Sequence, residues 1–467
     1  MRSESDSQPA AGAVAAPLRR TARERRRRWR ALPLALGIAL STIAPLLQVD
    51  VALATGEQPA GARRGVEPGT ECRPTLTGVA HQDDDLLFIN PEVQRLVRRR
   101  CAVGTVYLTA GDAGHSFTED RYVQRREEGL RASYAAMAGV ANRWHRSDLT
   151  VRGHRLVSFV LDERPDVRLV FLRLPDGFSK GAGSARYSGQ SLLKLFRGQT
   201  ARIRAVDGAG SYTREELTSV ISGVVSLLKA QRILTLDYDS TTFGVGPPNP
   251  ADHSDHEMTG RFFRKAAFLA PARPAVASYV GYGLSLLPAN LTPQQRRDKE
   301  AAYAAYLRYA GCPKGPCPAR PALSQAFRRW MAREHTRFHR RPRPGEIVSA
   351  MGHTNAKAAV ERCLTRGLGR FAGTAVATAD CDGRPGQQWT FAGATVKDAG
   401  SGACLTASTE VAMAPCSGSA AQTWWRDADG RIGTGSRCLH QDDLAMPRPR
   451  LTLAPCGPYQ PEVRWQW

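Results

Sequence analysis

Several features common in nucleic-acid-binding proteins are absent from this chain of 467 residues. It has no lysine-rich block, no RNA-binding signature and no zinc-finger spacing of cysteine and histidine. None of its ten cysteines forms a C-x-x-C pair, which argues against metal binding by cysteine. The chain therefore gives little support to specific nucleic-acid binding, although its net charge of +22 is strongly basic.

The positive charge is scattered along the chain, mostly as arginine. The first 54 residues hold nine arginines and four acidic residues, so they carry +5 and the remainder carries +17. A basic surface favours anionic partners such as acidic glycans or phospholipid headgroups. A polyanion-binding protein is therefore one hypothesis, and a solvated basic surface without a specific partner is its alternative.

The N-terminal residues 1–54 have the order of an export signal. Eight arginines lie between Arg19 and Arg30, the uncharged run Ala31 to Leu47 follows, and Ala52 and Ala54 form an A-x-A arrangement. This order predicts export, with cleavage after Ala54. The apolar run has 17 residues and is close to the minimum for a membrane span, so an uncleaved anchor is the alternative. In either case we expect the protein to be secreted or to face the outside of the membrane.

Cysteine usage agrees with export. An even number of cysteines in an exported protein predicts disulfides, and six of them lie at a rhythmic spacing in the last 105 residues. We expect neighbours along the chain to pair, although sequence alone does not determine the connectivity. The cysteines are Cys72, Cys101, Cys312, Cys317, Cys363, Cys381, Cys404, Cys416, Cys438 and Cys456.

Residues 55–71 read as a linker, and residues 72–311 alternate between strand-like and helix-like runs. One helix-like run opens with a capping box, Thr213 followed by Glu216. Alternation of this kind predicts an α/β domain, with a Rossmann-like, mostly parallel sheet and flanking helices. The strand-like runs are Leu76–Ala80, Val103–Thr109, Arg168–Leu172 and Arg232–Leu236.

Residues 312–355 are rich in proline and arginine, which indicates a connecting segment. Residues 356–467 contain a sequence pattern that occurs three times. Three units open with Cys-Leu at Cys363, Cys404 and Cys438, and each continues to a second cysteine and a tryptophan. Two units contain Q-x-W. Three such units predict a closed threefold β module. The pattern resembles the ricin B-chain-like β-trefoil, whose Q-x-W motifs hold its core and which usually binds sugars.

Two short segments carry candidate metal ligands. "AHQDDD", Ala80 to Asp85, follows the first strand-like run, and "DHSDH", Asp252 to His256, follows the run that ends near Asp237. A hydrolytic zinc site needs about three nitrogen or oxygen ligands and one position open to water. Each segment alone is often a solvated loop or a surface helix, but their joint occurrence favours a metal-dependent hydrolase. His335 and His339 are four positions apart but lie in an arginine-rich segment away from the predicted strand ends, so we expect them to be surface residues.

"AHQDDD" resembles the A-H-P-D-D-E motif of the LmbE-like, or PIG-L-type, zinc-dependent N-acetylglucosaminyl deacetylases, and "DHSDH" resembles their H-x-D-H motif. "LTAGDAG", "RREEGLRASYAAMAGV" and "RLPDG" resemble further segments of that family, so the likeness covers about residues 74 to 270. The resemblance implies one Zn²⁺ ion per chain. It implies His81, Asp84 and His256 as zinc ligands, Asp83 as the general base, His253 as the oxyanion stabiliser or acid, and Asp255 as the residue that orients His253. Arg125 and Asp176 are implied as substrate contacts.

The chain departs from both patterns. Gln82 stands where the deacetylases have proline, and Asp85 stands where they have glutamate. Sugar-binding trefoil units usually carry an aspartate just after the opening Cys-Leu, and here only the third unit has acids close by, Asp442 and Asp443. The resemblance therefore implies at most one carbohydrate-binding site, and a purely structural trefoil is the alternative.

Taken with the resemblances, the sequence predicts an exported zinc-dependent deacetylase that hydrolyses the N-acetyl or N-acyl amide of an N-acetylglucosamine-type sugar or glycoconjugate. Its trefoil would serve as a carbohydrate-binding module that attaches to polysaccharide or cell wall. The alternative is a secreted carbohydrate-binding protein with a catalytically inactive α/β domain. Contact with a membrane is expected only through an uncleaved N-terminal segment.

Overall fold

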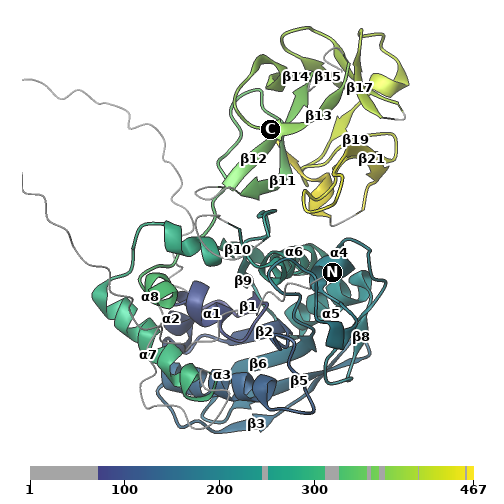
Figure 1. Cartoon of the computed structure of the whole chain (residues 1–467). Coiled ribbons are helices and arrows are strands. Elements are labelled where there is room, and N and C mark those ends of the chain that lie inside the picture. Colours follow the sequence, from purple (N-terminus) through teal and green to yellow (C-terminus); the bar gives the residue numbers. More distant parts are fainter. Residues whose placement is uncertain are drawn as a thin grey trace, which may run out of the picture. The chain divides into compact units, whose positions relative to one another are not determined.

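The computed structural model describes residues 72–243, 251–310, 325–354, 359–367, 374–408, 410–457 and 460–467 (Figure 1). The predicted export signal and linker, together with Cys312 and Cys317, lie outside these residues. Among the helices of the described ranges, none is both long and apolar enough to cross a membrane.

A mostly parallel sheet forms the centre of the first domain, in the order β10-β9-β1-β2-β6-β5-β3, with β4 paired to β5. The neighbours from β10 to β6 run parallel, whereas β5 is antiparallel to β6, and β3 and β4 are antiparallel to β5. The predicted α/β fold is thus confirmed. The strands are β1 Thr75–Val79, β2 Val103–Thr109, β3 Trp144–Arg146, β4 Leu149–Val151, β5 His154–Leu161, β6 Arg164–Leu174, β9 Arg232–Leu236 and β10 Ala275–Tyr279, with β7 Ile203–Arg204 and β8 Ser211–Tyr212 paired separately.

Helices cover both faces of this sheet (Figure 1). Residues of α2, α3 and α7 pack in one apolar cluster with the sheet, and residues of α4, α5 and α6 pack in the other. Burial on both faces explains why β1 and β2 are buried along their whole length. The helices are α1 Asp84–Phe88, α2 Glu92–Arg98, α3 Tyr122–Ala138, α4 Leu192–Phe196, α5 Arg214–Leu227, α6 Ser254–Leu269, α7 Pro293–Ala310 and α8 Gln325–Met331.

Local signals in the sequence account for several helix ends. The α5 helix begins at the predicted capping box, because the Thr213 side chain accepts from the Glu216 amide and the Glu216 carboxylate accepts from the Thr213 amide. The α3 helix ends at Gly139, which has a φ of 68° and the left-handed conformation that glycine adopts without strain.

The second domain contains three four-stranded antiparallel sheets, which is the arrangement expected of a β-trefoil. Their orders are β13-β12-β11-β22, β14-β15-β16-β17 and β18-β19-β20-β21. Because β11 pairs with β12 and β22, this domain begins before residue 356, the boundary expected from the repeat. The strands are β11 Val348–Thr354, β12 Ala359–Arg366, β13 Val376–Asp380, β14 Trp389–Ala392, β15 Thr395–Asp398, β16 Cys404–Ala407, β17 Val411–Ala414, β18 Trp425–Arg426, β19 Ile432–Thr434, β20 Arg437–Gln441, β21 Leu451–Pro455 and β22 Trp465–Gln466.

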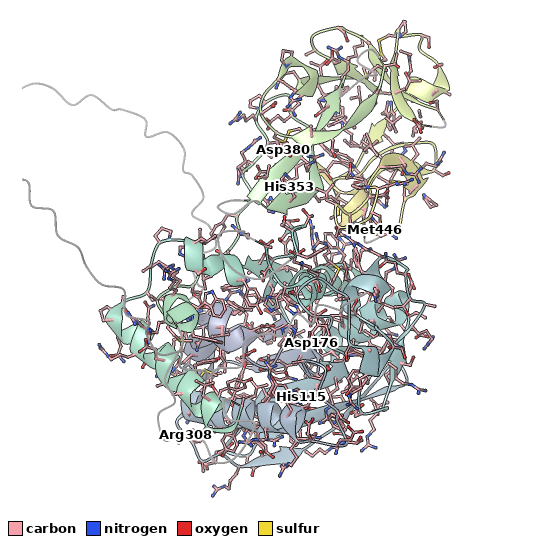
Figure 2. All side chains as sticks on the ribbon, viewed as in Figure 1. His115, Asp176, Arg308, His353, Asp380 and Met446 are labelled. Atoms are coloured by element: carbon pink, nitrogen blue, oxygen red, sulfur yellow. A yellow bond between two sulfur atoms is a disulfide. The ribbon has the colours of Figure 1, made fainter. Side chains whose placement is uncertain are left out.

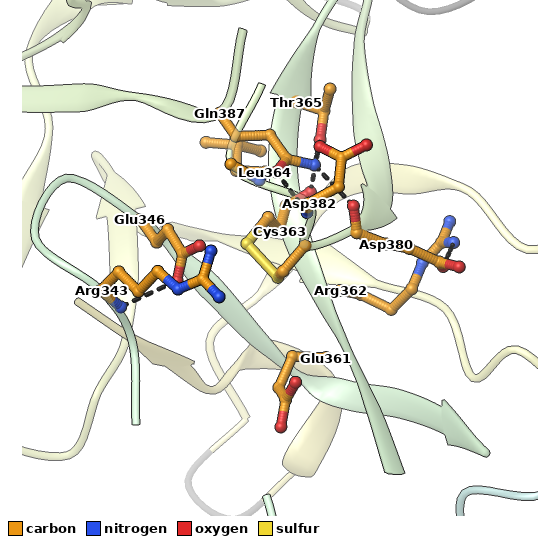
Figure 3. The surroundings of a disulfide bond; sticks show 12 residues. Arg343, Glu346, Glu361, Arg362, Cys363, Leu364, Thr365, Asp380, Asp382 and Gln387 are labelled. Carbon is orange, nitrogen blue, oxygen red and sulfur yellow. Dashed lines mark hydrogen bonds and ion pairs between the residues drawn. A yellow bond between two sulfur atoms is a disulfide. The ribbon is translucent and has the colours of Figure 1, made fainter. Parts of the chain in front are cut away.

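In the two units that contain Q-x-W, the glutamine links the strands and loops of its unit through buried hydrogen bonds. Figure 3 shows Gln387 beside the Cys363 disulfide, with its Nε2 donating to Thr365 Oγ1 and to the Asp380 carbonyl. Its Oε1 accepts from the amides of Asp382 and Gly383. All four hydrogen-bonding positions of this buried amide are therefore satisfied, and the loop after β13 is held to β12.

The disulfides follow the predicted order of neighbours. Four bonds lie within the described residues, one in the α/β domain and one in each trefoil unit. Each connects a cysteine to the next one along the chain, which confirms the pairing for these eight residues. They are Cys72–Cys101, Cys363–Cys381, Cys404–Cys416 and Cys438–Cys456.

Candidate active site

The three consecutive aspartates after β1 point to three different partners, so their charges do not face one another. The turn that enters α1 rotates each side chain away from the next. Asp83 Oδ1 accepts from Arg126 Nη2 (2.8 Å), Asp84 Oδ2 accepts from the amides of Ala80 (3.1 Å) and His81 (2.7 Å), and Asp85 Oδ2 accepts from the hydroxyls of Tyr107 (3.0 Å) and Tyr134 (2.7 Å).

The three predicted zinc ligands meet at the carboxyl end of β1. His81 Nδ1 lies 3.2 Å from His256 Nε2, and His256 Nε2 lies 3.0 Å from Asp84 Oδ1. His81 Nδ1 lies 3.4 Å from Asp84 Oδ2. Ligands at zinc-bond lengths in a tetrahedral site lie about 3.3 Å from each other. The three donor groups therefore fit a zinc ion, and the chain brings them together across 175 positions of sequence.

The outer nitrogens of both histidines face carboxylates. His256 Nδ1 lies 2.8 Å from Asp252 Oδ1, and His81 Nε2 lies 3.5 Å from Asp255 Oδ2. His81 Nε2 is buried and makes no hydrogen bond within the described part of the chain. A carboxylate on the second nitrogen is the usual support of a metal-binding histidine, because it orients the ring and raises its basicity. This second observation also fits a metal at the site.

The charges of the ligand groups are coupled. Burial alone would raise the pKa of Asp84, but His256 and His81 lower that pKa well below its ordinary value. Burial would lower the pKa of His256, but Asp84 and Asp252 raise it to about 10. The site therefore keeps a carboxylate beside an imidazolium, and a metal ion has to displace the imidazolium proton to bind.

His253 has a different environment from the other two histidines. Its Nδ1 accepts from the Asp255 amide at 3.2 Å and so caps the N-terminus of α6, which leaves its proton on Nε2. Burial and the neighbouring His81 lower the pKa of His253 to about 3, so the ring is neutral. Its Nε2 lies 3.7 Å from Asp176 Oδ1. His253, His81 and His256 are also close enough to hold a metal ion together.

The two predicted aspartates near the histidines do not play the same part. Asp176, which follows β6 and is labelled in Figure 2, lies 3.8 Å from His81 Nε2 as well as close to His253. The Asp255 carboxylate accepts from the Gly177 amide at 2.7 Å and faces His81. It lies 3.5 Å from His81 Nε2 and 3.8 Å from His253 Nδ1, and neither approach is a hydrogen bond, whereas the Asp255 amide donates to His253 Nδ1.

The arginine at the site is Arg126, whereas the sequence pointed to Arg125. Arg126 donates to Asp83, to the Gly111 carbonyl (2.8 Å) and to the Tyr306 hydroxyl (2.9 Å). Arg125 Nε donates instead to the Tyr309 carbonyl (3.1 Å) and does not reach the site. Adjacent residues of a helix point about 100° apart, and two consecutive arginines carry no signal that distinguishes their directions.

Two further residues at the site were missed. Asp252 stands four positions before His256 and just ahead of α6, and its place inside the quoted segment "DHSDH" marked it as a residue near the ligands. Tyr282, after β10, has its ring 4.9 Å from that of His256 and 6.3 Å from that of His253. Tyr282 is 26 positions from the motif, so nothing local in the sequence marks it.

Gln82 stands where the deacetylase motif has a proline, and its side chain contacts the end of the neighbouring strand β2. Its buried amide Nε2 donates to the Thr109 carbonyl at 3.2 Å, at the end of β2. Thr109 in turn donates to the Ala80 carbonyl through its amide (3.0 Å) and its hydroxyl (2.9 Å). The loop that carries His81 is therefore held in place despite the substitution.

The two candidate sugar-binding acids of the trefoil differ in exposure. Asp443 is buried and accepts from Arg261 Nε of α6 at 2.9 and 3.1 Å, and also from the Ala445 amide. Both its oxygens are thus engaged inside the protein. Asp442 is partly exposed and accepts from the Arg450 amide at 3.0 Å. A sugar could therefore reach Asp442 but not Asp443.

His339 has an acidic partner that sequence proximity did not reveal. Its Nε2 lies 2.6 Å from Asp239 Oδ2, and its Nδ1 lies 3.7 Å from Glu361 Oε1. His339 is exposed, as expected of a surface residue, and its partner Asp239 is 100 positions away in the chain. His335 Nε2 donates to the Pro288 carbonyl (2.9 Å).

Two family models match the chain and confirm both resemblances. Residues 76–267 match the model described as GlcNAc-PI de-N-acetylase, PIG-L, and residues 350–465 match the ricin-type β-trefoil lectin domain. A comparison with curated proteins finds no match.

Matches among solved structures have low sequence identity and low TM-scores. An N,N'-diacetylchitobiose deacetylase from Pyrococcus horikoshii is 13% identical, with 50% of this chain and 70% of that chain covered and a TM-score of 0.30. A 4-carboxy-2-hydroxymuconate hydratase from Pseudomonas putida is 12% identical, with 50% and 77% covered and a TM-score of 0.28. A non-toxic homologue of type II RIPs from bitter gourd (Momordica charantia), in complex with α-methyl-D-galactoside, is 15% identical, with a TM-score of 0.22. The match covers 26% of this chain and 46% of the bitter gourd chain.

Proposed function

We propose that this protein is an exported zinc-dependent deacetylase that hydrolyses the N-acetyl or N-acyl amide of an N-acetylglucosamine-type sugar or glycoconjugate. The observation that carries the proposal is the triangle of His81, Asp84 and His256 donor groups, 3.0 to 3.4 Å apart with one Asp84 oxygen near each histidine, and with Asp83 next to Asp84. The PIG-L match over residues 76–267 supports the amide as the bond that is cleaved.

His81, Asp84 and His256 would hold one zinc ion, with Asp252 and Asp255 behind the two imidazoles. When bound at such a site, zinc lowers the pKa of water toward about 7 and polarises a carbonyl group.

Asp83 is the general base in this proposal. Its side chain is 19% exposed, so water can reach it, and Arg126 Nη2 holds one of its oxygens at 2.8 Å. Burial raises the pKa of Asp83, although Arg126 opposes that rise. A carboxylate with a raised pKa is a better proton acceptor near neutral pH. Asp83 accepts the proton from the attacking water and passes it to the departing nitrogen.

His253 stabilises the charge that develops on the amide oxygen. Its ring is neutral and carries its proton on Nε2, because Nδ1 is committed to the Asp255 amide. A preorganised N–H donor in a buried site stabilises an oxyanion more strongly than water does. Asp176, close to both His253 and His81, lies where a sugar hydroxyl can be bound.

The departures from the deacetylase motif do not favour an inactive domain. Gln82 is engaged with the end of β2, and Asp85 is engaged with two buried tyrosines. Neither side chain belongs to the donor triangle. For the trefoil we propose carbohydrate binding, supported by the lectin-domain match. The four disulfides are compatible with export.

The test combines metal analysis with product analysis by mass spectrometry on N-acetylglucosamine oligosaccharides and N-acetylated glycoconjugates. We expect about one zinc per chain and loss of acetyl groups. Asp83→Asn should keep the zinc and lower kcat by roughly 10²- to 10⁴-fold. His81→Ala should lose the zinc, and His145→Ala, at a surface histidine paired with Asp162, should behave as wild type. Absence of zinc, with unchanged activity in the first two variants, would refute the proposal.

A further inference from the structure

The threefold repeat of the trefoil brings three unlike side chains together. Phe391, Arg426 and Trp467 each stand two residues after the core tryptophan of their unit, so they occupy equivalent positions. The Arg426 guanidinium carbon lies 3.8 Å from the ring centroid of Phe391 and 5.5 Å from that of Trp467. The two ring centroids lie 5.9 Å apart.

Arg426 has no acidic partner within the described residues. It is exposed, and its contacts there are with the two aromatic rings. The neighbouring acid, Asp427, is already engaged, because its two oxygens accept from the amide and the Nε of Arg431 at 2.9 and 2.6 Å. Aromatic contacts use the faces of a guanidinium and leave its N–H edge available. Arg426 is therefore a cation held by two aromatic rings, and its guanidinium N–H groups are available to donate to an acceptor.

Two adjoining cavities lie beside this cluster and share Asp427, Ala428 and Trp467. The first, of about 640 Å³, is lined by Trp424, Trp425 and Arg426. The second, of about 520 Å³, is lined by Trp465 and by the exposed Arg341. Trp467, 42% exposed, lines both. Trp424 and Trp465 are buried, so the two hollows together form one shallow, open cleft whose accessible aromatic side chains are Trp425 and Trp467, with an arginine in each half.

We propose that this cleft binds an anionic oligosaccharide, with a pyranose packed on Trp467 and its carboxylate or sulfate paired with Arg426. The proposal rests on carbohydrate binding by the trefoil, and it locates that binding where the three units meet rather than beside Asp442. A pyranose presents an apolar C–H face that an indole ring can cover. The planar fork of arginine matches carboxylate and sulfate oxygens. Arg341, in the adjoining half, is placed for the next acidic sugar along the chain.

The test is calorimetric titration of the full chain at low salt with tetragalacturonate and with its fully methyl-esterified form. A galactose tetrasaccharide with sulfate esters and its desulfated form make a second pair. None of these probes carries an N-acetyl group, so the catalytic site cannot process them. We expect at least one anionic probe to bind about tenfold or more tightly than its neutral form. The pair with the larger ratio distinguishes carboxylate from sulfate as the preferred group.

Three variants separate the cleft from general electrostatic attraction. Arg426→Gln should reduce the preference for the anionic form to near unity. Trp467→Ala should weaken both forms about tenfold, and Trp467→Phe, which keeps a ring, should retain most of the binding. Arg448→Gln removes the same charge from an exposed position that does not line the cleft, and it should change little.

Three outcomes would overturn the inference. Equal losses in Arg426→Gln and Arg448→Gln would show diffuse charge attraction. Loss in Asp442→Asn, with full binding in Trp467→Ala, would keep carbohydrate binding by the trefoil but remove the cleft. No binding of any probe would remove the cleft and leave the deacetylase proposal intact, because that is tested by amide hydrolysis.

Discussion

Replacing Asp252 with asparagine is a sharp test of the metal centre, because it removes one charge and hardly any volume. Asp252 is buried, and its Oδ1 lies 2.8 Å from His256 Nδ1. The same oxygen accepts from the amides of His253 (2.8 Å) and Tyr282 (3.2 Å), which an asparagine oxygen can still do. Asp252→Asn therefore keeps the loop in place while it takes the carboxylate away from a zinc ligand.

The magnitude follows from the role of that carboxylate. Asp252 is one of two carboxylates that raise the pKa of His256 to about 10, so its removal makes the imidazole a weaker base and a weaker ligand. Loss of a partner on the outer nitrogen of a metal-binding histidine costs about 10- to 100-fold in metal affinity. This corresponds to about 1.4 to 2.8 kcal/mol of binding free energy. We expect zinc affinity to fall by that factor.

The assay is competition for zinc between the protein and a chromogenic chelator at pH 7.5, with thermal unfolding recorded in parallel. Asp162→Asn is the matched control, because Asp162 Oδ1 lies 2.9 Å from His145 Nδ1 in an exposed pair away from the site. Its zinc affinity should equal that of wild type. If Asp252→Asn folds and binds zinc as tightly as wild type, the negative charge of Asp252 does not support a zinc ligand, and the reasoning is refuted.

Three further predictions concern other contacts. Arg126→Gln should lower kcat about tenfold or more without loss of zinc, because Asp83 loses the donor that orients it; unchanged kcat in steady-state assays would contradict this. Burial lowers the pKa of His339, but Asp239 and Glu361 raise it to about 9, so its charge stabilises the fold fully below pH ~6.5 and loses this effect as the pH rises through 9. In His339→Gln, the unfolding free energy should fall less between pH 6.5 and 9 than in wild type, by on the order of 1 kcal/mol after solvent screening. Urea unfolding at a series of pH values measures this. The same pH dependence in the variant and in wild type would argue against the pairing. Gln387→Ala removes four hydrogen bonds inside a trefoil unit and should lower its unfolding free energy by about 2 to 4 kcal/mol in the same assay, with a loss below about 0.5 kcal/mol as the contrary result.

Much of the fold could be predicted from the sequence, because its signals are local. The run Arg232–Leu236 is a strand with those bounds, and the capping box at Thr213 begins a helix where it was predicted to begin. Cysteines that are neighbours in the chain pair within the described residues, since each trefoil unit closes on itself. The two family models match the regions where the motifs and the repeat were read.

For the candidate site, the sequence identified the ligand residues, and the tertiary structure showed how they come together. The residue types in "AHQDDD" and "DHSDH" were enough to select His81, Asp84 and His256, because zinc requires nitrogen and oxygen donors of this kind. Their convergence depends on β1 and β9 lying next to each other in parallel, so that both loops leave the sheet at the same edge.

Only the tertiary structure decided which neighbouring residue faces which partner. Arg126 rather than Arg125 reaches Asp83 because a helix rotates its side chains by about 100° per residue. Asp443 is buried against α6 while Asp442 next to it is partly exposed. Arg426 meets two aromatic rings because three units related by a repeat place equivalent positions side by side. Sequence patterns specify residue types and periods, whereas direction and proximity across the chain come from packing.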